Sequence, residues 1–337
     1  MDIVLLLLGI SLLVGGGHWL VKGASELARA LGVSPLVIGL TVVAFGTSAP
    51  ELAVNVSAAL QGRGEISFGN VIGSNLANIG LILGVTALFK PLPVQGCLIR
   101  RELPLMLLAT AAVVSLALDP WLRGESAYFD RGDGVVLLLF FAVFIYATAS
   151  EVLRGRSTDP MLAQSLDEAG DAPEPTPDGA SLWGAAGAGL AGLLALLAGG
   201  RVTVDAASEI ARAAGVSEAV IGLTVVAVGT SLPELVASVV ATAKGAPDIA
   251  IGNVVGSNLF NLLFVLGITA SVRPVEVPAD GLPDLMALAV LSALMLPLAL
   301  TYQRRVVRRE GALLLALWAG YTLWRCTAGA GAAVVGA

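Results

Sequence analysis

The chain has 337 residues, of which 56% are hydrophobic and 13% are charged, and its mean hydropathy is +0.87. Soluble domains carry about 25% charged residues, so the composition excludes an ordinary soluble protein and indicates a polytopic membrane protein. A net charge of −6, without a basic patch interleaved with aromatic residues, argues against a nucleic-acid partner. The single histidine, His18, and two isolated cysteines, Cys97 and Cys326, argue against a histidine metal site and a disulfide.

Ten apolar runs are long enough to cross a bilayer. They lie at 3–22, 34–60, 67–89, 103–118, 134–153, 181–200, 217–243, 250–271, 283–301 and 311–327. Asp2, where a signal peptide would carry a basic residue, favours a retained spanning helix for the first run. Residues 154–180, rich in Pro, Asp and Glu, cannot bury a core and are predicted to be a linker. We therefore predict an all-α membrane protein with a first five-helix repeat (1–153), an acidic linker (154–180) and a second five-helix repeat (181–337).

The two halves are copies of each other at an offset of 183 residues. Across Val37–Leu52 and Val220–Leu235, 14 of 16 positions are identical, and only Phe45/Val228 and Ala49/Leu232 differ. Five helices per copy is an odd number, so the second copy must cross the membrane in the opposite direction. Inverted repeats with interrupted helices are typical of secondary transporters.

The distribution of Lys and Arg predicts the orientation, because cytoplasmic loops carry an excess of both. Twelve lie on one side: Lys22, Arg29, Lys90, Arg100, Arg101, Arg154, Arg156, Lys244, Arg304, Arg305, Arg308 and Arg309. Seven lie on the other side: Arg63, Arg123, Arg131, Arg201, Arg212, Arg273 and Arg325. We expect both termini outside and the linker 154–180 in the cytoplasm.

The motif Gly46-Thr47-Ser48-Ala49-Pro50-Glu51 occurs in the second predicted span and returns as Gly229-Thr230-Ser231-Leu232-Pro233-Glu234. A carboxylate at this depth costs roughly 2.5 to 3.5 kcal/mol on insertion scales, and such residues are functional by default. Each proline lacks an N–H, which frees the carbonyl four residues earlier. Freed carbonyls beside hydroxyls and a carboxylate form an oxygen cage of the kind that hard cations prefer.

A second repeated block, Gly69–Asn78 and Gly252–Asn261, follows each motif. Ser74 and Asn78 are four residues apart and share a helix face, as do Ser257 and Asn261. The glycines are best explained by close helix packing, whereas the matched amides are candidate ligands. Two glutamates and the carbonyls near Thr47 and Thr230 supply about six oxygens, a number that suits Ca²⁺. Smaller monovalent sites would use the hydroxyls of Thr47, Ser48, Ser74, Thr230, Ser231 and Ser257.

The repeated G-T-S-x-P-E and G-N-x-x-G-S-N-x-x-N blocks resemble the α-repeats of the cation/calcium exchanger superfamily, most closely prokaryotic sodium/calcium exchangers. The resemblance covers both halves and implies alternating access, with the first and sixth helices sliding against the other eight. It implies that Glu51 and Glu234 are shared carboxylates and that Thr47 and Thr230 offer carbonyls to Ca²⁺. It also matches Asn78 to an asparagine of the central site, and it matches a set of Na⁺ positions: Ser48, Ser74, Ser231, Ser257 and the backbone of Ala44 and Ala227.

One position departs from this pattern, because many members of the family have an aspartate where this chain has Asn261. With amides at both Asn78 and Asn261 the site holds at most two negative charges, which puts a three-for-one sodium stoichiometry in doubt. Two Na⁺ balance one Ca²⁺ here, and H⁺ and K⁺ remain alternative coupling ions.

Three other functions compete with Ca²⁺/Na⁺ exchange. In a Ca²⁺/H⁺ exchanger, protons would compete with the metal for buried carboxylates, and uptake would follow pH rather than sodium. Carboxylates can also line the pore of a cation channel. A channel would give single-channel currents. An enzyme is disfavoured because no zinc motif, histidine base or nucleophile elbow is present. We therefore expect Ca²⁺ and Na⁺ as transported ions, no organic cofactor, no obligate protein partner and a prokaryotic inner-membrane location.

Overall fold

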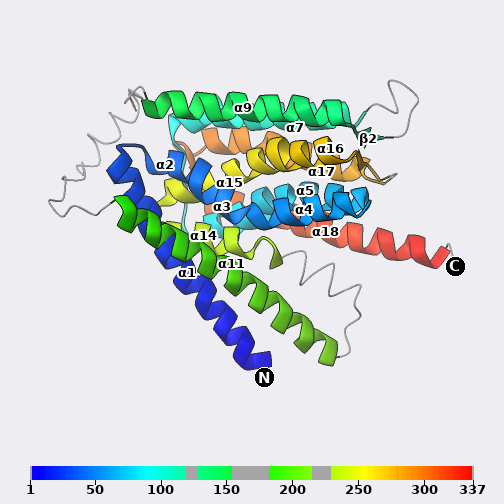
Figure 1. Cartoon of the computed structure of the whole chain (residues 1–337), viewed down its shortest axis with the longest axis horizontal. Helices are drawn as coiled ribbons and strands as arrows, with labels where there is room; N and C mark the ends of the chain where they lie inside the picture. The colour runs from blue at the N-terminus through cyan, green and yellow to red at the C-terminus, as the bar shows by residue number, and fades with distance from the viewer. Residues whose placement is uncertain (1, 119–126, 154–181, 215–228, 279, 336–337) are drawn as a thin grey trace.

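The computed structural model describes residues 2–118, 127–153, 182–214, 229–278 and 280–335. Nearly all of them are helical (Figure 1). The first repeat consists of α1 (Asp2–Leu31); α2 (Pro35–Ile38), η1 (Gly39–Val43), α3 (Ala44–Thr47) and α4 (Ala49–Leu60); α5 (Gly64–Ala77), η2 (Asn78–Leu83) and α6 (Gly84–Phe89); η3 (Leu98–Glu102) and α7 (Leu103–Leu116); and α9 (Arg131–Leu153). The segments labelled η are stretches of wider, π-type helix.

The second repeat follows the same plan. It consists of α11 (Leu182–Ala213); α14 (Leu232–Ala243); α15 (Pro247–Leu259), η5 (Phe260–Val265) and α16 (Leu266–Val272); α17 (Leu282–Leu300); and α18 (Arg308–Val335). Each of the ten predicted spans thus coincides with helix, although the span 217–243 is described only from Gly229 onward and the linker 154–180 lies outside the described residues. Among the described helices, six are individually long and apolar enough to cross a membrane, or seven with the bent α2–α4 run.

Two helices are much longer than the sequence predicts. The first and sixth runs were expected at 3–22 and 181–200, but α1 has 30 residues and α11 has 32. The apolar run underestimates each helix because its last turns carry charged side chains, such as Lys22 and Glu26 one turn apart in α1. These turns contain good helix formers and no proline, so the helix continues after the apolar run has ended.

Four short strands, which the sequence did not predict, reveal the relative orientation of the two repeats. Strand β1 (Leu92–Pro93) pairs with β4 (Arg305–Val306), and β2 (Tyr128–Phe129) pairs with β3 (Val275–Glu276). Each pairing joins the loop after the third span of one copy to the loop after the fourth span of the other. Such loops share a side of the membrane only if the copies run in opposite directions. The fold is therefore the predicted pair of inverted five-helix repeats.

Helices α1 and α11 pack against each other as a pair that crosses the rest of the bundle at an angle (Figure 1). Their backbones touch, because a Cβ atom added at Gly192 would lie 2.2 Å from the Leu20 backbone nitrogen. Close backbone approach through small residues is how membrane helices associate without a hydrophobic driving force between them. The main core lies in the other helices and gathers the buried faces of α5, α7, α15 and α17.

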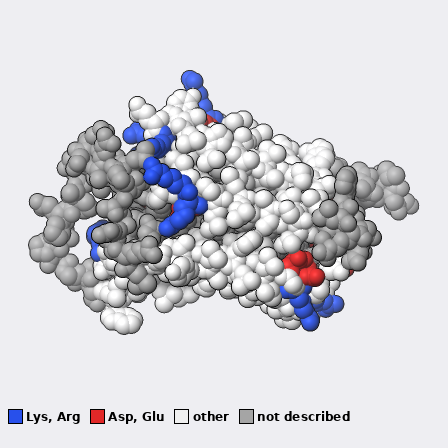
Figure 2. Space-filling model, turned by 90° about the horizontal axis from the view of Figure 1, so that it is seen from above, with Lys and Arg blue, Asp and Glu red and all other residues white. Residues whose placement is uncertain are grey.

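On the face shown in Figure 2, charged side chains lie mainly toward the two ends of the long axis. Figure 2 shows Lys and Arg gathered toward the end at which α1 finishes and α11 begins, with a smaller mixed group of charges near the opposite end. The broad middle of this face carries neither sign of charge, as expected for a surface in contact with lipid.

Candidate cation site

At both copies of the motif a helix begins directly after the same serine. The first copy breaks at Ser48 (φ −88°, ψ 6°), where the chain bends by 43° between the α2–α3 run and α4. The second copy has nearly the same backbone conformation at Ser231 (φ −91°, ψ 3°), immediately before α14. The proline that follows, Pro50 or Pro233, lies in the first turn, where its missing N–H costs nothing.

The breaks place both glutamates in the first turn of a half-helix, inside the protein. Glu51 and Glu234 are each only 2% exposed. Their carboxyl groups lie close enough to interact electrostatically. The Ser48 hydroxyl donates to Glu234 Oε1 at 3.4 Å, so a residue of the first motif contacts the carboxylate of the second. The two motifs therefore form one site, in which positive helix ends face two acidic side chains.

Four buried oxygen atoms of the predicted site residues have no hydrogen-bond partner among the described residues. They are Glu51 Oε2, Glu234 Oε2, Ser257 Oγ and Asn261 Oδ1. Leaving a buried polar atom unpaired costs about 1–3 kcal/mol, and more for a charged group. Carboxylate, amide and hydroxyl oxygens are also the ligands that hard cations prefer. The donor set therefore fits a site for hard cations.

The predicted amide ligands lie where helices widen. Asn78 is the first residue of η2, and Asn261 is the second residue of η5. Both side chains are buried. Each widened turn contacts a motif helix of the other repeat, because η2 contacts α14 and η5 contacts α4. Wide turns of this type are rare and frequently mark functional positions.

The remaining predicted residues differ in their burial and in whether the structure describes them. Thr47 and Ser231 are buried at the two breaks, Ser74 is buried on α5, and Ala44, also buried, begins α3. Thr230 lies in the turn before α14 and is partly buried. Ala227 lies outside the described residues, so its predicted role is not tested.

Comparison with known protein families identifies the chain. The model of the family described as "Sodium/calcium exchanger protein" matches residues 1–149 and 184–327. The chain belongs to this family. The predicted resemblance is therefore confirmed over both repeats.

Two relatives and one solved structure show how far the similarity extends. The exchanger is 38% identical to "Inner membrane protein YrbG" of Escherichia coli (strain K12), over 95% of this chain and 94% of the relative. It is 32% identical to "Sodium/calcium exchanger MaX1" of Methanosarcina acetivorans, over 95% of this chain and 97% of the relative. The solved structure of the sodium-calcium exchanger NCX_Mj soaked without Na⁺ and Ca²⁺ matches with a TM-score of 0.78 at 32% identity, covering 94% of this chain and 96% of that one. The protein is thus an integral membrane antiporter that exchanges cations, Ca²⁺ among them, and not an enzyme.

One residue of the exchanger was missing from the predicted site. Asn253 is completely buried on α15, and its Oδ1 lies 3.2 Å from the Thr47 hydroxyl. Its Nδ2 donates to the Glu234 carbonyl at 3.4 Å and to Ser238 Oγ at 3.1 Å. Asn253 therefore ties the first motif to the second. The signal was present in the sequence, because Asn70 and Asn253 are matched amides at the start of the second repeated block, as Asn78 and Asn261 are at its end.

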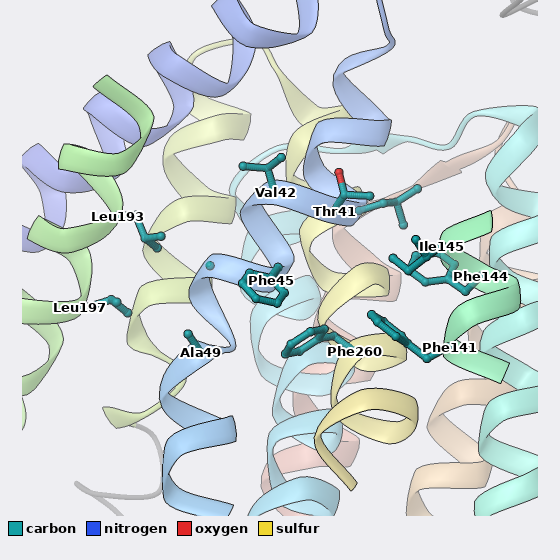
Figure 3. Close-up of a pocket in the computed structure, with 12 residues that line it drawn as sticks. Thr41, Val42, Phe45, Ala49, Phe141, Phe144, Ile145, Leu193, Leu197 and Phe260 are labelled. Carbon is teal, nitrogen blue, oxygen red and sulfur yellow. The ribbon is translucent and has the colours of Figure 1, made fainter. Parts of the chain in front are cut away.

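A cavity of about 460 Å³ lies beside the first motif. Its lining is apolar and includes Phe45, Phe141 and Phe260 (Figure 3). The rings of Phe45 and Phe260 meet edge to face, with 5.0 Å between their centroids. Both are positions at which the repeats differ, since their counterparts are Val228 and Ala77. The aromatic pair at the first motif therefore has no equivalent in the sequence at the second motif.

Proposed function

We propose that this exchanger carries Ca²⁺ in one direction and Na⁺ in the other, with Glu51 and Glu234 as carboxylates that both cations use in turn. The observation that carries the proposal is the pair of buried glutamates, each on a helix that contacts a widened turn bearing a matched asparagine. An oxygen of each glutamate, Ser257 Oγ and Asn261 Oδ1 have no partner among the described residues. Two carboxylates balance either one Ca²⁺ or two Na⁺, so the two loads compete for the same charge. NCX_Mj and MaX1, which are named as sodium/calcium exchangers, support Na⁺ as the coupling ion here by similarity.

The Ca²⁺/H⁺ exchanger remains a second candidate, and one observation favours it. Asn78 and Asn261 are both amides, so the described site has two carboxylates, a number that two protons neutralise as completely as two Na⁺. Measurements of ⁴⁵Ca²⁺ flux in proteoliposomes under imposed Na⁺, K⁺ or pH gradients distinguish the candidates. Uptake that follows the Na⁺ gradient at constant pH supports the proposal, whereas uptake that follows only the pH gradient replaces it with proton exchange.

The orientation is part of the same proposal, with both termini outside and the linker 154–180 inside. The gathering of basic side chains at one end of the molecule supports it, because positive charge is retained on the cytoplasmic side. Lys244, one of the basic residues predicted to be cytoplasmic, follows α14 and donates through Nζ to the His18 carbonyl of α1 at 2.9 Å.

Asymmetry between the repeats supports alternating access. A Cβ atom added at Gly17 of α1 would lie 3.5 Å from Val240 Cβ of α14. The symmetry-related pair is Gly200 of α11 and Ser57 of α4, at the 183-residue offset. A Cβ atom added at Gly200 would contact the Pro233 side chain and not Ser57, and Ser57 is exposed. The α1–α11 pair thus covers α14 but leaves the matching face of α4 uncovered.

Exchanging the roles of the repeats gives the other state. In it, α11 moves over α4, so that Gly200 reaches Ser57, and α1 leaves Val240. With the proposed orientation α14 points to the cytoplasm and α4 to the outside, so the structure corresponds to the outward-open state. Sliding of a helix pair over the other helices is a known form of such transitions.

A further inference from the structure

The hydrogen bonds of Asn253 have a symmetry-related counterpart that is not formed. The offset of 183 residues relates Asn253 and Ser238 to Asn70 and Asn55. In the second repeat Asn253 Nδ2 donates to Ser238 Oγ at 3.1 Å. In the first repeat both corresponding atoms, Asn70 Nδ2 and Asn55 Oδ1, are buried without a partner among the described residues. A donor and an acceptor are thus left unpaired at the position where the other repeat pairs them.

This difference is specific to the donor of Asn70 and the acceptor of Asn55. The Asn55 side chain is already fixed, because its Nδ2 donates to the Glu51 carbonyl at 2.6 Å. The Asn55 carbonyl also accepts from the Ser67 hydroxyl at 3.1 Å, which joins α4 to α5, the helix that carries Asn70. The acceptor is therefore positioned beside the correct helix while its Oδ1 remains unpaired. A movement of α5 against α4 that brings Asn70 Nδ2 to Asn55 Oδ1 would complete the bond.

We propose that Asn253 and Asn70 are positioning residues that latch the two motif helices alternately, one in each state of the transport cycle. This inference rests on the proposed alternating exchange. In the state described here, Asn253 fixes the hydroxyl of Thr47 and the carbonyl of Glu234, and so sets the geometry of oxygens around the cation site. In the opposite state Asn70 donates to Asn55 Oδ1, and Asn253 releases Ser238. Each state then contains one satisfied amide and one unpaired amide.

An alternation of this kind follows from the cost of unpaired buried groups. If both latches could close together, both unpaired groups would be removed and the protein would be trapped in a single state. With one latch open in each state, the two states carry similar penalties and remain close in free energy. A transporter needs two states of comparable free energy, because a large difference would leave one of them unpopulated.

The test uses two pairs of cysteines, each reporting one state, in a background that carries Cys97→Ser and Cys326→Ser. Gly17→Cys with Val240→Cys reports the described state, since the 3.5 Å separation of the Cβ atoms is within the range of a disulfide. Gly200→Cys with Ser57→Cys reports the opposite state. The extents of oxidative cross-linking are compared in purified protein without Na⁺ or Ca²⁺. This readout requires no transport.

Asn253→Ala and its matched variant Asn70→Ala should move the two reporters in opposite directions. We expect Asn253→Ala to lower the ratio of the first cross-link to the second by about fivefold, the effect of losing one net hydrogen bond, and Asn70→Ala to raise it by a similar factor. Ser238→Ala, which removes only an acceptor hydroxyl, repeats the first result in a milder form and replaces Asn253→Ala if that variant does not fold.

Two results would overturn the latch. One is a shift of the same sign in both variants, and the other is an unchanged ratio in all three. These failures differ from failure of the proposed exchange. In that case the Gly200→Cys/Ser57→Cys pair would not cross-link even without the asparagine substitutions, or Na⁺-driven ⁴⁵Ca²⁺ uptake would be absent in the protein without reporters.

Discussion

Asn261→Asp should convert the exchanger from voltage-independent to voltage-dependent transport. The side chain is 1% exposed, its Oδ1 has no partner among the described residues, and η5 contacts the helix that carries Glu51. The substitution keeps the shape of the side chain and raises the negative charge of the site from two to three. Because buried charge must be balanced, the wild-type site should exchange two Na⁺ for one Ca²⁺, and the variant should accept a third Na⁺.

The size of the effect follows from the charge moved in each cycle. Two Na⁺ against one Ca²⁺ move no net charge, whereas three Na⁺ move one. One elementary charge crossing the membrane corresponds to about 2.3 kcal/mol per 100 mV. Since 1.4 kcal/mol is a factor of ten, the equilibrium Ca²⁺ gradient of the variant should change about fiftyfold per 100 mV, and that of the wild type should not change.

The assay measures ⁴⁵Ca²⁺ accumulation in proteoliposomes at several potentials clamped with K⁺ and valinomycin, after K⁺ itself has been tested as a substrate. Asn78→Asp is the matched control, because it adds the same charge at the symmetry-related position and should give the same voltage dependence. Strong voltage dependence in the wild type that Asn261→Asp leaves unchanged would refute the charge-counting argument.

Two other predictions concern orientation and pH. A cysteine introduced as Ser165→Cys into the background without native cysteines should resist an impermeant maleimide in intact cells and react after permeabilisation, and efficient labelling from outside would reverse the proposed orientation. The hydrogen bond and ion pair with Arg325 lower the pKa of Asp280 below its usual 3.8. A carboxyl group whose pKa is depressed by folding stabilises above its unfolded pKa and loses this contribution as pH falls through its folded pKa. Asp280→Asn should therefore lower the melting temperature slightly at pH 7 and not at pH 2–3, and a difference that persists unchanged in acid would contradict the assignment.

The architecture was largely predictable because the chain contains it twice. The identity between Val37–Leu52 and Val220–Leu235, together with five apolar runs per copy, predicted the inverted repeats, and the family match and the strand pairings confirm them. The motif also predicted a helix break, since a proline within an apolar run cannot continue the hydrogen-bond ladder. The lengths of α1 and α11 were not predictable from hydropathy, because their last turns are amphipathic.

The difference between the repeats could not be predicted, since nearly identical motifs carry no information about which state is populated. The contact of Gly17 with Val240, and its absence between Gly200 and Ser57, depend on how α1 and α11 lie against the bundle. Asn253 was missed for a related reason. Its role depends on the crossing of α3 and α15, which brings Thr47 to an amide 206 residues away.

The shared use of two glutamates is the central claim, and Na⁺-driven ⁴⁵Ca²⁺ uptake by Glu51→Gln and Glu234→Gln in proteoliposomes tests it most directly. Glutamine keeps the volume and one oxygen of each side chain but removes the charge that Ca²⁺ and Na⁺ share. We expect either variant to insert, remain monodisperse and lose uptake, while the wild type accumulates Ca²⁺ against its gradient when Na⁺ flows the other way. Uptake at the wild-type rate in either variant would show that the carboxylate concerned is not a shared ligand.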